Sequence, residues 1–138
     1  MIHCRFSIHR LCQALAFTCL LSALPGALRA EGTGYSLVMV DQPGCFYCIR
    51  WREEIGPAYP NTEFGAYAPL RNVQLRDIPE DLSFERRVLF TPTFIVVDGA
   101  GVEVGRLEGY PGEDFFWPML ERVLAETTPF EPVPPLEN

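Results

Sequence analysis

The chain has 138 residues, enough for one domain of ordinary size and too few for two. It carries 11 positive and 18 negative side chains, a net charge of −7, and no lysine. Nucleic acids and anionic membranes bind through clustered positive charge, so this balance argues against both as partners. The five cysteines are an odd number, and three of them lie within the first nineteen residues.

Residues 1–30 have the three parts of a secretory signal peptide. Two arginines give a basic start, residues 11–24 form an apolar run, and a small-residue region ends at Ala30. We expect cleavage after Ala30, with Ala27 as the second choice. A retained membrane anchor is the alternative, but the run contains a glutamine and is short for a membrane span.

Cleavage at this point would change what the chain contains. It would leave 8 arginines against 18 acidic residues, a net charge of −10, and no histidine. The only remaining cysteines would be Cys45 and Cys48. Both would lie in the periplasm, an oxidising compartment that permits disulfides.

The first half of the mature chain shows two periodicities. An apolar run typical of a buried strand precedes a stretch in which charged and apolar residues interleave as in a helix, and alternating residues further on predict a strand with one wet face. In chain order we expect a strand at residues 35–40, a turn at 41–44, a helix from 45 to about 58, a short helix at 63–67, a strand at 72–77 and a short helix at 80–87.

The second half of the chain has clearer secondary-structure signals. Glycines at residues 98–101 supply the turn of a hairpin whose strands are residues 92–97 and 102–107. Residues 113–126 carry acidic side chains in the first turn and apolar ones at helical spacing, which predicts a terminal helix. The Pro-rich acidic tail, residues 127–138, has no packing pattern, and we expect it to be disordered.

The order is β-α-β, a short helix, and then β-β-α. A parallel pair joined through a helix, extended by an antiparallel hairpin, predicts a mixed central sheet. We therefore expect a three-layer α/β domain over residues 31–126, with helices on both faces of the sheet.

The chemistry lies in residues 44–48, where two cysteines stand three residues apart after a strand and a turn. This spacing places Cys45 at the start of a helix and Cys48 one turn later, with Cα atoms about 5 to 6 Å apart, within disulfide reach. Free N–H groups at a helix start stabilise an anion, so the pKa of the Cys45 thiol should fall from about 8.5 into the range of roughly 3.5 to 7.5. Cys45 is therefore predicted as the attacking thiolate and Cys48 as the buried resolving thiol.

The surroundings of the C-x-x-C pair bear on its other known uses. Covalent haem requires a histidine after the second cysteine, and Ile49 stands there. Structural zinc requires four ligands, which two thiols without histidine supply only in a dimer or with carboxylates. An inert structural disulfide remains open, although so short a loop constrains the unfolded chain little.

A second motif supports the redox interpretation. Residues 90–94 place Thr91-Pro92 at the start of an apolar strand. With the C-x-x-C helix start, the glycine hairpin and the terminal helix, residues 35–126 resemble the thioredoxin superfamily. The resemblance implies that Pro92 is cis and lies against the disulfide, and that the backbone of Thr91 contacts the substrate. It implies no cofactor.

Four stretches narrow the resemblance to the SoxS-type periplasmic thioredoxins of bacterial sulfur oxidation: residues 41–48, 54–60, 90–94 and 108–117. This family implies a reductant that clears disulfides or mixed disulfides from the thiosulfate-carrying Sox carrier protein. We expect a monomer, since the extra domain of dimeric disulfide isomerases is absent from this sequence. A membrane thiol transporter of the CcdA or DsbD kind would supply the electrons. A thiol reductase for cytochrome c maturation and a non-enzymatic binding module with a structural disulfide are the alternatives.

The sequence also departs from typical thioredoxins. Phe46 and Tyr47 replace Gly-Pro between the cysteines. The buried aspartate and the lysine that usually handle the proton of the second cysteine are replaced by Met39 and Gln74. Asp41 and Glu54 are the possible substitutes as proton acceptors, although a turn residue and a solvated helix charge are the simpler interpretations.

Overall fold

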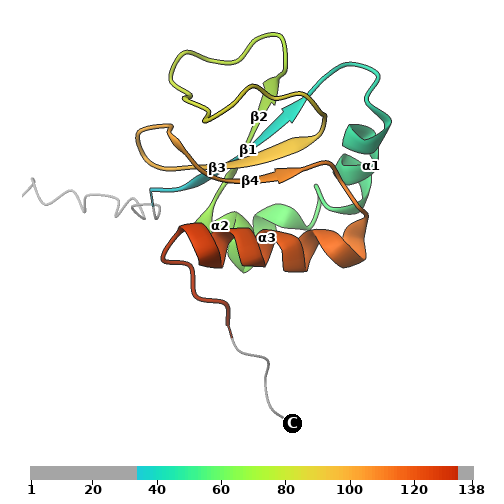
Figure 1. Cartoon of the computed structure of the whole chain (residues 1–138). Helices are drawn as coiled ribbons and strands as arrows, with labels where there is room; N and C mark the ends of the chain where they lie inside the picture. The colour runs from blue at the N-terminus through green and yellow to red at the C-terminus, as the bar shows by residue number, and fades with distance from the viewer. Residues whose placement is uncertain (1–33, 134–138) are drawn as a thin grey trace, which may run out of the picture. The chain divides into compact units, whose positions relative to one another are not determined.

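A computed structural model describes residues 34–133 of the chain. The predicted signal peptide, with its cleavage sites, and residues 134–138 lie outside this range. The elements appear in Figure 1 in the order β1 (Ser36–Asp41), α1 (Phe46–Glu54), the 3₁₀ turn η2 (Tyr59–Asn61), α2 (Glu63–Tyr67), β2 (Leu70–Gln74), β3 (Thr93–Val97), β4 (Glu103–Glu108) and α3 (Glu113–Thr127).

The four strands form one mixed sheet in the order β2-β1-β3-β4. β1 runs parallel to β2, with Val40 beside Val73, and antiparallel to β3, with Val38 beside Ile95. The β3–β4 hairpin completes the sheet, with an irregular register between Val96 and Val97. The predicted mixed sheet is confirmed.

All three α-helices contribute to one core cluster, which covers one face of the sheet. Trp51 of α1 lies at its centre, with ring centroids 5.2 Å from Phe94 of β3 and 5.7 Å from Phe116 of α3. Phe64 of α2 joins the same cluster. These aromatic contacts fix α1, and therefore the C-x-x-C pair, against the sheet.

The other face of the sheet is covered by a segment without helix, which Figure 1 shows on the side of the sheet away from α2 and α3. The prediction of a helix at residues 80–87, and with it helices on both faces, is wrong. Leu82, Phe84 and Val88 pack on a second cluster that includes Val38 and Ile95. The segment is not helical because its backbone bonds to the hairpin instead: the N–H of Ser83 donates to Gly101 O at 2.9 Å, and the N–H of Glu103 donates to Ser83 O at 2.9 Å.

Two other elements differ from prediction by more than one residue. β2 begins and ends two or three residues early because its parallel register pairs Leu70 with Leu37 and Gln74 with Asp41, so it ends where β1 ends. Helix α1 ends at Glu54 instead of about residue 58, before the Gly56-Pro57 pair that interrupts it.

The beginning of the C-terminal tail is packed. Phe130 is buried, with ring centroids 5.4 Å from Phe64 and 5.0 Å from Tyr67. The expected lack of packing therefore fails at this residue, and disorder remains a prediction for residues 134–138. No helix within residues 34–133 is long and apolar enough to cross a membrane.

Candidate active site

Cys45 and Cys48 form a disulfide at the start of α1. Their Cα atoms are 5.2 Å apart, within the expected range, and α1 begins at the residue after Cys45. The preceding Gly44 has φ +76°, a conformation that favours glycine and turns the chain from the end of β1 into the helix. The turn at residues 42–44 therefore places the cysteine pair at the carboxyl end of β1.

The two sulfur atoms occupy different surroundings. Cys45 is the N-cap of α1, and its Sγ accepts a hydrogen bond of 3.1 Å from the backbone N–H of Cys48. Cys45 is 9% exposed, whereas Cys48 is fully buried. A thiolate at position 45 would therefore be reachable and would be stabilised by a helix N–H, whereas the second thiol is shielded from solvent.

A groove of about 430 Å³ lies beside the cysteine pair. It joins the C-x-x-C motif to the Thr-Pro motif and to the end of β4, and the Thr91–Pro92 peptide bond is cis. The N–H of Gly109 donates to Pro92 O at 2.8 Å, which ties the two loops together. The lining residues are Tyr47, Phe90, Thr91, Glu108, Gly109 and Tyr110.

Apolar side chains stand exposed around this groove. Phe46 and Tyr47 project from the first turn of α1, and Leu89 and Phe90 are 72% and 62% exposed. Exposed apolar side chains gathered at one site are typical of a protein-binding surface. Sequence reasoning did not select Leu89 or Phe90. Their position directly before the Thr-Pro motif, with no apolar periodicity to bury them, was the available signal.

Glu54 does not lie with the cysteines. Its Oε2 accepts from the Tyr110 hydroxyl at 2.6 Å, and its Oε1 accepts from Arg50 Nε at 2.8 Å. These two hydrogen bonds hold the pKa of Glu54 below its ordinary value. Six residues of helix place Glu54 about 9 Å along the axis from Cys48 and on a different side, so the geometry does not support a proton-acceptor role.

Asp41, the other candidate, is 1% exposed and faces the same side of β1 as the core residue Met39. Its carboxylate is bound by Gln74 of β2 and by Arg52 of α1. Arg52 follows Cys48 by one helical turn, so this ion pair joins β1 to the cysteine-bearing side of α1. The interpretation of Asp41 as a simple turn residue is therefore wrong, and the carboxylate is a buried anchor for α1.

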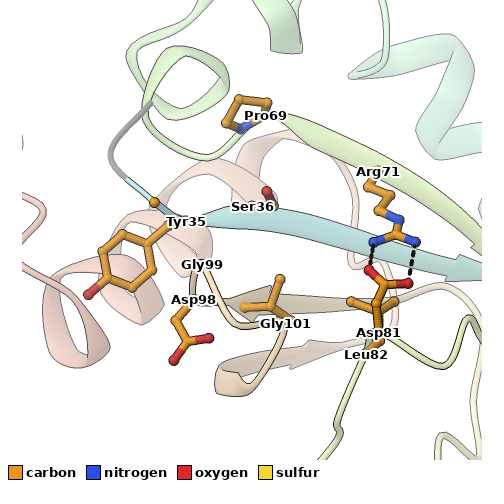
Figure 2. A pocket seen from close by; sticks show the side chains of 11 residues that line it. Tyr35, Ser36, Pro69, Arg71, Asp81, Leu82, Asp98, Gly99 and Gly101 are labelled. Atoms are coloured by element: carbon orange, nitrogen blue, oxygen red, sulfur yellow. Dashed lines mark hydrogen bonds and ion pairs between the residues drawn. The ribbon is translucent and has the colours of Figure 1, made fainter. Parts of the chain in front are cut away.

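A second cavity, of about 410 Å³, lies at the opposite end of β1, where Figure 2 shows Ser36, Pro69 and Gly99 along its walls. The Arg71 guanidinium binds both carboxylate oxygens of Asp81 there, at 2.5 and 3.0 Å. No cysteine lines this second cavity. Across residues 34–133 there is also no group of three His, Cys, Asp or Glu side chains that could hold a metal ion.

Comparison with known proteins identifies the class. The Thioredoxin-like domain family matches residues 26–124, so the chain belongs to the thioredoxin superfamily. With its C-x-x-C pair, it is a thiol-disulfide oxidoreductase, and the predicted thioredoxin-like fold is confirmed.

The chain is similar to a particular member of that superfamily. The crystal structure of the periplasmic thioredoxin SoxS from Paracoccus pantotrophus, in its reduced form, is 55% identical, with a TM-score of 0.64 over 67% of this chain and 97% of that one. The predicted closeness to SoxS is confirmed. A search of curated proteins found no match.

Proposed function

We propose that this chain is a periplasmic reductant that resolves disulfides or mixed disulfides on a partner protein. The Cys45 thiolate attacks one sulfur of the partner disulfide, forms a mixed disulfide and releases the other sulfur as a thiolate. Cys48 then loses its proton and attacks Cys45 Sγ. The bond between Cys45 and the partner breaks, and the partner sulfur leaves as a thiolate. The partner has then gained the two electrons that the Cys45/Cys48 dithiol lost on forming its disulfide.

One observation carries this proposal, namely the different surroundings of the two cysteines. Cys45 caps α1 and is 9% exposed, whereas Cys48 is fully buried, so Cys45 is the more accessible of the two. Attack on an external disulfide requires an accessible thiolate, and an internal resolving thiol is best kept from solvent and from oxidants. Thr91 lines the adjacent groove, and we propose that it aligns the partner segment beside the cis Pro92.

Likeness to SoxS supports a narrower choice of compartment and partner. We propose that residues 1–30 direct export to the periplasm, that the substrate is the thiosulfate-carrying Sox carrier protein, and that a CcdA- or DsbD-type membrane transporter returns the electrons. The exposed apolar rim and the net charge suit a protein substrate better than a nucleic acid.

The chemistry is tested with two matched variants, Cys45→Ser and Cys48→Ser, in the reduction of insulin disulfides. We expect Cys45→Ser to abolish reduction. Cys48→Ser should lose turnover but accumulate a covalent mixed disulfide, because its attacking thiolate is intact. Full activity of Cys45→Ser would refute the assignment.

The partner is tested by trapping with Cys48→Ser in the native periplasm, followed by mass spectrometry of the covalent complexes. Recovery of the Sox carrier protein supports the proposed partner, and Cys45→Ser is the control because it forms no complex through position 45. Recovery of apocytochromes alone would instead indicate a reductant for cytochrome c maturation. The intact mass of the exported chain tests cleavage after Ala30.

A further inference from the structure

The segment that leads to the active-site groove has neither helix nor strand. Residues 82–91 run from the second core cluster to the cis Pro92 and end on the exposed pair Leu89 and Phe90. Thr93 Oγ1 donates to Phe90 O at 2.8 Å, which fixes the end of the segment to β3. An irregular segment holds such a shape only where other groups satisfy its backbone.

A buried ion pair on β4 lies against this segment. The side chains of Glu103 and Arg106 are 4% and 5% exposed. Arg106 binds Glu103 with two hydrogen bonds, Nε to Oε1 and NH2 to Oε2, each 2.7 Å long. Such a bidentate geometry has a fixed orientation, so the pair forms a rigid unit.

Each partner of the pair also binds the backbone of the segment. Glu103 Oε2 accepts from the N–H of Glu85 at 2.9 Å, and Arg106 NH2 donates to the carbonyl of Arg86 at 2.9 Å. Glu108 adds a further contact, because its Oε1 accepts from both Arg86 and Arg106. The backbone N–H of Glu85 and the backbone carbonyl of Arg86 are thus held by charged side chains of β4.

The position of this contact relates it to the groove. Only three residues separate Arg86 from Phe90, and Glu108 lines the same groove as Phe90 and Thr91. Loss of the contact at residues 85 and 86 would free the chain directly before the groove wall. Partner binding would then have to order these residues, at a cost in affinity.

We propose that the Glu103–Arg106 pair positions residues 87–91 as the partner-binding wall of the groove. The inference rests on the proposed reductase function. In this positioning role the pair acts on the groove wall and not on either cysteine. It therefore affects the affinity for a protein substrate and leaves the thiol chemistry unchanged.

The test uses Glu103→Leu/Arg106→Met, which removes both charges together and leaves neither partner buried alone. The measurement is reduction of insulin, a protein substrate, and of 2-hydroxyethyl disulfide, which needs no extended groove. We expect KM for insulin to rise about twofold to tenfold, with kcat unchanged. The rate with the small disulfide should be unchanged, and amide hydrogen exchange at residues 87–91 should be faster.

Arg106→Lys provides a second variant, because it keeps the charge and loses the fork that reaches both Glu103 and Arg86. If the double variant fails to fold, Arg106→Lys allows the same comparison of insulin with 2-hydroxyethyl disulfide. Arg122→Lys, in an exposed pair with Glu126 on α3, is the control and should leave both substrates unaffected.

The outcomes separate this inference from the proposed function. An unchanged KM in folded variants, or equal losses with both substrates, would overturn the positioning role while leaving the reductase assignment intact. Wild-type protein that reduces neither substrate would overturn both. A higher KM for insulin alone supports the inference.

Discussion

The hydroxyl of Tyr110 donates a 2.6 Å hydrogen bond to Glu54 Oε2, which joins residues 56 positions apart in the chain. Arg50 completes the contact, since it binds Glu54 and lies over the Tyr110 ring with its guanidinium carbon 5.9 Å from the centroid. The loop after β4, which carries one wall of the groove, is thereby attached to the C-terminal end of α1. Burial, and then the bond to Glu54, raises the pKa of Tyr110, so the phenol stays a donor at every physiological pH.

Tyr110→Phe should destabilise the fold in a manner that depends on pH. The folded-state pKa of Glu54 lies below its unfolded value, so the stability it adds is fully present above about pH 4.3 and is lost as the pH falls through the lowered pKa. The difference in urea midpoint between wild type and Tyr110→Phe should therefore be largest at neutral pH and narrow in acid.

Glu54→Gln supplies the control for this measurement. In that background Tyr110→Phe should change the midpoint by an amount independent of pH between neutral and acid solution, because no carboxylate titrates at the contact. A constant difference in both backgrounds would show that Glu54 does not use the hydroxyl.

Arg52→Met should cost more stability than Asp41→Asn. Asp41 is 1% exposed and Arg52 is 45% exposed, so removal of the arginine leaves a buried carboxylate, whereas removal of the carboxylate leaves a cation that water can solvate. We expect losses of about 3 kcal/mol for Arg52→Met and about 1 to 2 kcal/mol for Asp41→Asn, measured by urea unfolding.

The double variant Asp41→Asn/Arg52→Met tests whether the unpaired Asp41 carboxylate causes the loss of stability in Arg52→Met. It should be more stable than Arg52→Met alone, because an uncharged amide beside Gln74 needs no cation. Arg122→Met, which removes an exposed pair, is the matched control and should have no measurable effect. A double variant less stable than Arg52→Met would contradict the explanation.

Local signals predicted the parts of this molecule that depend on neighbouring residues. The cysteine spacing placed the disulfide, and glycines placed the hairpin, because each depends on a few adjacent backbone angles. The irregular course of residues 80–87 could not be predicted in this way, since its partners lie on the β3–β4 hairpin. The burial of Asp41 likewise depends on Arg52 and Gln74, which only the folded chain brings together.

Gly101→Ala should destabilise the fold more than Gly34→Ala, although both glycines have a φ close to +80°. The shared backbone cost is about 1 to 2 kcal/mol. At Gly101 a Cβ would also overlap the carbonyl oxygen of Asp81, whereas nothing lies near Gly34. The overlap should add about 1 to 3 kcal/mol.

Urea unfolding of the two alanine variants checks this difference, because Gly34 reproduces the strain without the contact. Gly101 lies where the segment before the groove first meets the hairpin, so Gly101→Ala should also raise KM for insulin. Equal losses of stability in the two variants would show that the Asp81 backbone moves away without cost.

Phe130→Ala should destabilise the domain by about 2 to 4 kcal/mol, as truncation of a buried aromatic does. Phe130 packs on Phe64 and Tyr67 and closes the core at the end of the sheet remote from the disulfide. Val133→Ala, three residues later and exposed, should leave the urea midpoint unchanged. Reduction of insulin should be unaffected by Phe130→Ala at temperatures where the variant is folded, because its ring partners Phe64 and Tyr67 do not line the groove. A neutral Phe130→Ala would mean that residues 127–133 contribute nothing to the core, and the Pro-rich tail would then begin directly after α3.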